Sequence, residues 1–186
     1  WGIDAAYSGS QKCLSSTPGL SPVSFSPAAV ERIRARKTPC PSWFQDLSLV
    51  LGYWSGAKRT YHHTAPVNPL YGLHESLVML AEEGLEAAWQ RHRDNHLQLR
   101  AGLEALGLNF VVREDARLPQ LNTVWVPEGI DEAAARTRLL QEFGLEIGAG
   151  LGVLAGKVWR IGLMGHSSRQ ANIALCLAAL KTVIQR

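Results

Sequence analysis

The chain has 186 residues, of which 46% are hydrophobic and 19% charged, and its formal net charge is +3. This composition is ordinary for a globular protein, and no apolar run approaches the ~18 residues that would cross a membrane. The basic residues are scattered rather than interleaved with aromatic residues, so the sequence predicts neither a membrane nor a nucleic-acid partner.

The cysteines and histidines do not form a metal or disulfide pattern. Cys13, Cys40 and Cys176 are odd in number and far apart, which suits neither a disulfide framework nor a zinc site. The six histidines form no ligand set, so no metal is expected. Unpaired cysteines are typical of a reducing compartment, and a cytoplasmic location is therefore expected.

The N-terminal third is predicted to begin with two apolar strands within residues 1–26, joined by a turn that carries Lys12. Ser26-Pro27 then starts a helix, because serine is a good cap and proline suits the first turn. That helix is expected to end near Thr38, which precedes a proline. Residues 39–60 are rich in proline, glycine and aromatic residues, and we expect an irregular but packed segment.

The rest of the chain predicts an α+β domain after a long helix. Leucine and alanine recur at helical spacing from about residue 69 to 92. Short strands separated by helices then favour an α+β arrangement. The expected elements are a helix ending at Gly107, strands over 108–112 and 122–126, a helix from the Asp131 cap to Gly144, strands over 145–147 and 158–163, and a last helix capped by Ser167 or Ser168.

Lys12 is the candidate nucleophile. On a tight turn between two buried strands, the charged form of a lysine would be costly to desolvate. The neutral amine can attack a carbonyl and form a Schiff base. The alternative is a solvated loop lysine. Nearby, Ser8 and Ser10 are candidate phosphate donors or, equally, turn-forming residues.

Two further places carry candidate binding groups. Tyr61 and Thr64 lie in the segment Tyr-His-His-Thr and offer hydroxyl donors suited to phosphate oxygens, unless Tyr61 is structural. Arg160 lies inside an apolar strand, where a buried guanidinium must find an anion. Its planar fork suits a carboxylate, either of a ligand or of a local acidic residue.

Four segments together resemble the class V pyridoxal-phosphate aminotransferases, of the alanine–glyoxylate and serine–pyruvate type. They are Ser8–Lys12 (with Pro18-Gly19 and Ser24-Phe25-Ser26 after it), Tyr61–Val67, Leu70–Leu77 and Gly156–Gly165. The segments extend over nearly the whole chain, and their order and spacing make the resemblance specific. The resemblance implies an α/β fold, that of the fold type I PLP-dependent transferases.

In such a fold, residues 1–65 would be the C-terminal part of the large PLP-binding domain. Residues 66–94 would be a connecting helix, and residues 95–186 a small α+β C-terminal domain. Lys12 is twelfth here and mid-chain in the resembling family, so we expect the C-terminal half of an enzyme. Such a half would lack three features that lie upstream in that family: the acidic residue that pairs with the pyridine nitrogen, the aromatic residue that stacks on the ring, and the glycine-rich phosphate loop. Little or no activity is therefore expected of this half alone.

The resemblance also implies a role for each candidate residue. Lys12 would form the Schiff base with pyridoxal 5'-phosphate and then move the substrate's α-proton. Gln11 would help to hold the cofactor, unless its amide bonds only the backbone. Tyr61 and Thr64 would reach the cofactor phosphate of the neighbouring subunit in a homodimer. Arg160 would bind the α-carboxylate of the amino acid or 2-oxo acid.

The implied reaction transfers an amino group from alanine or serine to glyoxylate or pyruvate. Two alternatives remain open. One is another class V reaction such as cysteine desulfuration, for which Cys40 would be the nucleophile. The other is a non-catalytic chain: a fragment, a degenerate gene product, or a partner for a separately encoded N-terminal half.

Overall fold

The computed structural model describes residues 1–54 and 60–185 and divides the chain into two compact units. The first unit comprises Trp1–Ser10 and Ser16–His74, and the second comprises Gln11–Ser15 and Glu75–Arg186. The division lies within helix α3 (Val67–Glu83), and the short segment around Lys12 belongs to the second unit. None of the described helices is long and apolar enough to pass through a membrane.

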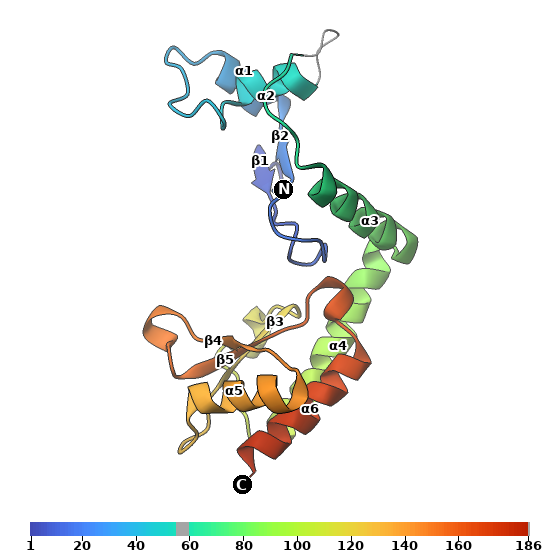
Figure 1. Ribbon diagram of the computed structural model, residues 1–186, viewed down its shortest axis with the longest axis vertical. Helices are drawn as coiled ribbons and strands as arrows, with labels where there is room; N and C mark the ends of the chain where they lie inside the picture. Colours follow the sequence, from blue (N-terminus) through green and yellow to red (C-terminus); the bar gives the residue numbers. More distant parts are fainter. Residues whose placement is uncertain (55–59, 186) are drawn as a thin grey trace. The chain divides into compact units, whose positions relative to one another are not determined.

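The first unit opens with two antiparallel strands, β1 (Ala5–Tyr7) and β2 (Val23–Phe25), which confirms the strand pair predicted around Lys12 (Figure 1). Their register pairs Ala6 with Ser24. The side chains of both strands are exposed or half-buried, so the expectation of buried strands is wrong for this chain. A two-stranded ribbon shields neither of its faces by itself.

Helix α1 (Pro27–Arg34) begins where it was predicted. The Ser26 hydroxyl accepts a hydrogen bond from the backbone N–H of Ala29, and Pro27 occupies the first turn. The helix ends at Arg34, before the predicted Thr38. Beyond it, the Arg36 N–H donates to the Ile33 carbonyl at 3.3 Å, so the four-residue helical bonding pattern is not continued.

Helix α2 (Leu47–Trp54) lies within residues 39–60, which were predicted to be irregular, so that prediction is wrong for this part. The Asp46 carboxylate accepts a hydrogen bond of 2.9 Å from the backbone N–H of Ser48, as a capping side chain does. Residues 55–59 of the predicted segment lie outside the described residues.

The long helical pattern forms two helices, α3 and α4 (Leu85–Ala105), rather than the single helix expected over 69–92. Gly84 separates them with a φ of +87°, in the left-handed region that favours glycine. The second helix ends close to the predicted Gly107, whose φ is also positive.

A three-stranded antiparallel sheet forms the centre of the second unit. Its strands are β3 (Leu121–Trp125), β4 (Gly148–Ala149) and β5 (Val158–Gly162), in the order β3-β5-β4. β3 and β5 confirm two predicted strands.

Two other predicted strands differ from the structure. Residues 108–112 contribute only an isolated bridge between Phe110 and Val124. The strand expected over 145–147 forms instead at Gly148–Ala149, where the chain pairs with Arg160 and Trp159 of β5. A strand requires a partner, and the pairing with β5 begins only at Gly148.

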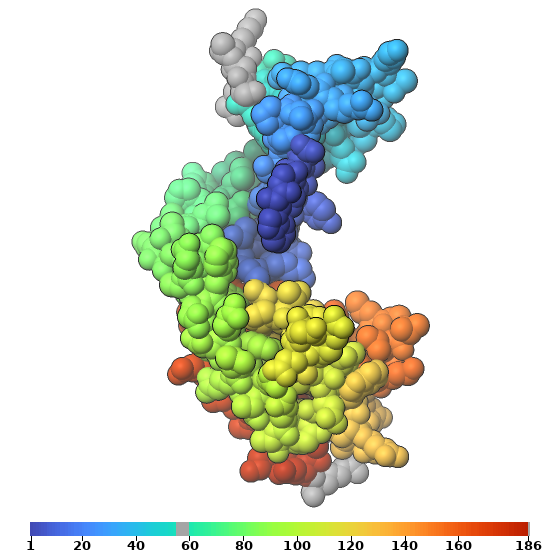
Figure 2. Space-filling model, turned by 180° about the vertical axis from the view of Figure 1, so that it is seen from behind, coloured from blue at the N-terminus to red at the C-terminus, as the bar shows by residue number. Residues whose placement is uncertain are grey.

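Helices α4, α5 (Glu132–Phe143) and α6 (Gln170–Ile184) pack with the sheet around one core, which confirms the predicted α+β arrangement (Figure 1). Figure 2 shows that α4 (green to yellow-green) also forms much of the surface of this unit on the rear side. Trp159, Val124 and Leu99 are completely buried. Among the described residues of this unit, three 3-10 turns are also present: η1 (Glu114–Ala116), η2 (Gly152–Leu154) and η3 (Gly165–Ser167).

Helix α5 has both predicted ends. The Asp131 carboxylate accepts a hydrogen bond of 2.9 Å from the Ala134 N–H, and Gly144 ends the helix in the left-handed conformation.

Helix α6 does not begin with a serine cap, as was predicted. Its N-cap is Arg169, while Ser167 belongs to η3. Ser168 is buried, and its hydroxyl accepts a hydrogen bond from the Asn95 amide instead of capping α6.

Candidate functional site

Lys12 lies on a turn formed by residues 11–15, hereafter the Lys12 turn. The backbone N–H of Ser15 donates a hydrogen bond of 2.9 Å to the Lys12 carbonyl, which closes a β-turn. At the base of this turn, Ser16 N–H donates to the Ser10 carbonyl at 3.0 Å. Lys12 is exposed. Its amine is therefore open to solvent in this chain, contrary to the expectation that burial desolvates it.

The neighbours of Lys12 differ in their surroundings. Gln11 is exposed, so its amide is accessible to a ligand. Ser10 is completely buried, and its hydroxyl donates a hydrogen bond of 2.7 Å to the Thr17 carbonyl. That bond favours the turn-forming interpretation of Ser10 over a role as a phosphate donor.

The hydroxyls of Tyr61 and Thr64 lie side by side, 2.7 Å apart. Tyr61 is 72% exposed, so the pair faces solvent. Each hydroxyl has one O–H donor, so when the bond between them opens the two can both donate to the oxygens of one phosphate group.

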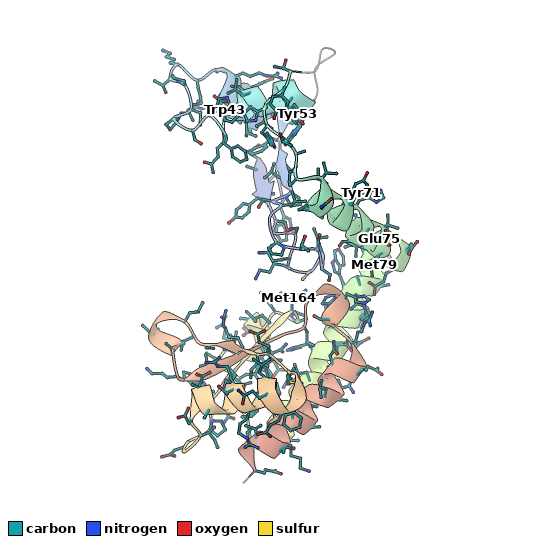
Figure 3. All side chains as sticks on the ribbon, viewed as in Figure 1. Trp43, Tyr53, Tyr71, Glu75, Met79 and Met164 are labelled. Carbon is teal, nitrogen blue, oxygen red and sulfur yellow. The ribbon has the colours of Figure 1, made fainter. Side chains whose placement is uncertain are left out.

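Aromatic side chains pack against Tyr61 and its neighbour His62. His62 is buried and stacks on Trp43 with ring centroids 4.1 Å apart, and its Nε2 lies 3.2 Å from the Trp43 carbonyl oxygen. The Tyr61 ring meets Tyr53 edge to face at 6.4 Å. Figure 3 labels Trp43 and Tyr53 within this group of rings. The Nδ1 atoms of His62 and its neighbour His63 lie 2.8 Å apart. Both histidines are thus packing residues.

Arg160 lies on the face of the sheet opposite to the core. Its neighbour Trp159 is completely buried, and side chains alternate between the two faces of a strand. The register pairs Arg160 with Thr123 of β3, which shares its face. Arg160 is half-buried rather than buried, which corrects the expectation from its apolar surroundings in the sequence.

The guanidinium of Arg160 extends across β4. Its Nε donates a hydrogen bond of 2.6 Å to the Ala149 carbonyl, and a Cβ at Gly148 would lie 3.4 Å from its Nη2. Within residues 1–54 and 60–185, no carboxylate lies within 4 Å of it, and this argues against the alternative of a local salt bridge. The outer edge of the guanidinium is therefore available to an anion from outside the described chain.

The candidate residues belong to two units. Tyr61 and Thr64 are in the first unit, where they contact each other. Gln11, Lys12 and Arg160 are in the second.

Sequence reasoning missed one residue of the Lys12 turn. The Ser15 hydroxyl accepts a hydrogen bond of 2.7 Å from the backbone N–H of His166, which is 151 residues away in the chain. No local pattern indicates this pairing. The only signal in the sequence was Gly165, the last residue of the Gly156–Gly165 segment.

These groups define what the chain can bind. An accessible amine can condense with a carbonyl, paired hydroxyls can hold a phosphate, and a guanidinium can hold a carboxylate. In the described part of the chain, no group of three or more His, Cys, Asp or Glu side chains is arranged to hold a metal ion.

Comparison with known proteins finds relatives whose chemistry suits these groups. The family model "Aminotransferase class-V" matches residues 1–173. Alanine–glyoxylate aminotransferase from Callithrix jacchus is 45% identical over 187 residues, covering 99% of this chain and 45% of that protein. (S)-Ureidoglycine–glyoxylate transaminase from Bacillus subtilis is 39% identical and covers 100% of this chain and 49% of its own length.

Solved structures show the same likeness. The crystal structure of alanine–glyoxylate aminotransferase from Nostoc sp. superposes with a TM-score of 0.95 at 47% identity, covering all of this chain and 49% of that one. Pyridoxamine–pyruvate aminotransferase from Mesorhizobium loti has a TM-score of 0.86 at 30% identity. The chain thus spans about half the length of the relatives it matches.

Proposed function

Because the chain belongs to the class-V aminotransferase family, with the fold of the PLP-dependent enzymes, we propose that it carries the cofactor lysine and the carboxylate-binding arginine of a glyoxylate-using transaminase. The observation that carries this proposal is the exposed Lys12 on its closed turn, within a chain matched almost throughout by transaminases. The chain spans about half of those relatives, so we propose the activity for the whole protein and not for these 186 residues alone.

Glyoxylate is the proposed acceptor because it recurs in the names of relatives whose donors differ. One relative is named for alanine and glyoxylate, and another for ureidoglycine and glyoxylate. The donor proposed here is alanine or serine, with pyruvate as a second acceptor. The reaction with alanine converts alanine and glyoxylate into pyruvate and glycine, so the amino group is conserved.

The residues present fit pyridoxal 5'-phosphate, which has an aldehyde and a phosphate. The Lys12 amine would hold the aldehyde carbon covalently, with release of water. The hydroxyls of Tyr61 and Thr64, 2.7 Å apart, are suited to the phosphate oxygens. Gln11, next to Lys12 and exposed, would help to hold the cofactor.

When bound, the cofactor would supply an electron sink that makes the substrate's α-proton acidic. Lys12 Nζ, once it is released from the cofactor, would take that proton from the substrate Cα and deliver it to the cofactor carbon. Arginine at this position would remain protonated and could not do so.

Arg160 would hold the substrate by its α-carboxylate. The bond from its Nε to the Ala149 carbonyl orients the guanidinium, so that its two terminal nitrogens can bind two carboxylate oxygens. This geometry recognises the group common to amino acids and 2-oxo acids, and it therefore suits both halves of a transfer reaction.

We further propose that the whole protein is a homodimer in which Tyr61 and Thr64 serve the cofactor of the neighbouring subunit, and that it is cytoplasmic. The exposure of both hydroxyls and the unpaired state of the three cysteines support these proposals. Cysteine desulfuration has no comparable support. Cys40 is half-buried, and the likeness to a NifS-like protein, at 17% identity, concerns the fold alone.

The test is covalent trapping of the cofactor. The protein is mixed with pyridoxal 5'-phosphate and reduced with borohydride, and the modified peptide is identified by mass spectrometry. We expect the adduct at Lys12, no adduct in Lys12→Ala, and an unchanged adduct in Lys37→Ala, which removes another exposed lysine. An adduct spread over several lysines, or none at all, would contradict the proposal. Production of pyruvate from alanine and glyoxylate by the whole protein then tests the substrates.

A further inference from the structure

His92 of α4 is buried and bonded on both ring nitrogens. Its Nδ1 lies 2.6 Å from the Ala88 carbonyl oxygen, and its Nε2 accepts a hydrogen bond of 2.9 Å from the backbone N–H of Gly165. A carbonyl can only accept, so the proton is assigned to Nδ1, which leaves Nε2 as the acceptor that Gly165 needs. The ring therefore connects α4 to η3.

Arg91, the preceding residue of α4, holds the other polar group of Gly165. Its Nη1 donates to the carbonyl oxygens of Gly165 at 2.9 Å and of Ser168 at 2.8 Å. Its remaining nitrogens bind the Glu83 carboxylate at 2.5 and 2.8 Å. Adjacent residues on one helix thus hold both the N–H and the carbonyl of a single glycine. Figure 3 labels Met164, which immediately precedes it.

On its other side, η3 contacts the Lys12 turn. The His166 N–H donates to the Ser15 hydroxyl at 2.7 Å, and Ser15 N–H closes the turn on the Lys12 carbonyl at 2.9 Å. Ser15 has a φ of +59°, the only positive value among the described non-glycine residues. A backbone in this region persists where surrounding contacts hold it.

The contact between η3 and the Lys12 turn leaves no room for a side chain at Gly165. A Cβ there would meet the Ser15 hydroxyl and would lie 2.5 Å from the Cys13 carbonyl oxygen. The φ of Gly165 is +54°, which also favours glycine. Two backbones can approach this closely only because the residue is glycine.

We propose that Arg91 and His92 are positioning residues for Lys12: they fix Gly165 and His166, which in turn hold Ser15 and the turn that presents the lysine. The proposal rests on the role of Lys12 proposed above. A reacting amine must be held close to its productive geometry, and a short exposed turn needs outside support to provide this. Here that support comes from α4, whose Arg91 and His92 are 73 to 77 residues away in the sequence from the Gly165 and Ser168 groups that they bond.

The first test measures hydrogen exchange of the backbone amides of Ser15, Ser16 and His166 in the protein without cofactor. His92→Leu removes the acceptor for Gly165, and we expect exchange at these amides to rise on the order of tenfold, because local opening becomes easier. His92→Gln, which restores an acceptor oxygen, should recover part of the protection.

The matched control is His96→Leu. His96 is one turn further along α4, is also buried, and its Nδ1 lies 2.6 Å from the Asn122 Oδ1. It should cost comparable stability without changing exchange in the Lys12 turn. Equal exchange in His92→Leu and the unmodified protein would overturn the proposal, as would an equal rise in His96→Leu.

A second variant guards against unfolding of His92→Leu. Ser15 is exposed, and Ser15→Ala removes only the acceptor for His166. We expect the His166 amide to lose protection in Ser15→Ala and to keep it in Thr17→Ala, which alters a neighbouring exposed position. An unchanged His166 amide in Ser15→Ala contradicts the proposal.

Trapping of pyridoxal phosphate at Lys12 separates this proposal from the proposed function. If the unmodified protein forms no adduct at Lys12 while the exchange results hold, the link is real and the function is wrong. If the adduct forms at Lys12 but the exchange rates do not respond, the function stands and the positioning role fails.

Discussion

Arg160 Nε donates a hydrogen bond of 2.6 Å to the Ala149 carbonyl, so the side chain of one strand is fixed to the backbone of the next. The bond involves only Nε of the guanidinium, and the two terminal nitrogens take no part in it. The absence of a β4 side chain at Gly148 gives the guanidinium the space to lie there. This orientation, more than the charge itself, is the basis of the first prediction.

Arg160→Lys should weaken binding of the amino acid and the 2-oxo acid. Lysine keeps the charge but loses both the bond to Ala149 and the planar fork. Hydrogen bonds to charged groups contribute about 1.5–3 kcal/mol, which corresponds to roughly 10- to 150-fold in affinity. The KM for each substrate in the whole protein measures this. Arg138→Lys is the control, because Arg138 only pairs with Glu142 on the surface of α5. Equal KM values for Arg160→Lys and the unmodified protein would refute the carboxylate role.

Tyr61→Phe should weaken cofactor binding about tenfold, since one hydroxyl donor to a charged phosphate is removed. The ring remains, and with it the edge-to-face contact with Tyr53 at 6.4 Å. The cofactor Kd of the whole protein is the measurement, and Tyr71→Phe, at an exposed position of α3, is the control. If Tyr61 has only a structural role, the cofactor Kd of Tyr61→Phe will instead equal that of the unmodified protein.

The three cysteines should react with iodoacetamide in a defined order at pH 8. Burial raises the pKa of the Cys176 thiol to about 12, so it should be neither ionised nor accessible in the folded protein. Cys13 is exposed and should be alkylated before half-buried Cys40. Peptide mass spectrometry over time gives the order, and denaturant should make Cys176 reactive. Early labelling of Cys176 in the folded protein would contradict the packing of α6.

Two helical glycines should respond to alanine with opposite signs. Alanine is favoured over glycine in a helix by about 0.8–1 kcal/mol. At Gly52 of α2 a Cβ meets nothing within 4 Å, so Gly52→Ala should stabilise the protein. At Gly102 of α4 a Cβ would overlap the Leu177 side chain, whose Cγ would be 3.0 Å away.

Gly102→Ala should therefore lower the free energy of unfolding, because overpacking costs about 1–3 kcal/mol and outweighs the gain in propensity. Urea denaturation measures both variants. In a Leu177→Ala background, the penalty of Gly102→Ala should disappear. A stabilising Gly102→Ala in the unmodified protein would show that α4 and α6 pack less closely than the structure indicates.

Local signals were reliable where one short stretch of chain contains the whole interaction. The Ser26 cap bonds Ala29, and the Asp131 cap bonds Ala134, so both partners lie within one turn. Gly144 ends α5 by its own left-handed conformation. Such features depend only on neighbours in sequence, and the sequence therefore predicts them.

Predictions failed where a partner far away in the sequence determines the local structure. Residues 108–112 have the composition of a strand, yet only Phe110 finds a bridge partner. Ser168 has the side chain of a helix cap, but it is buried against Asn95 of α4. In each case a contact over many residues overrides the local preference.

Motif residues and their spacing are properties of the linear chain, and they were enough to identify the family, the candidate lysine and the candidate arginine. Only the folded chain shows that Lys12 is exposed, that Arg160 faces away from the core, and that Ser15 bonds His166, which is 151 residues away. The physical reason is that exposure, strand face and hydrogen-bond partner depend on which surfaces pack together. Packing joins segments whose separation in the sequence carries no signal of their contact.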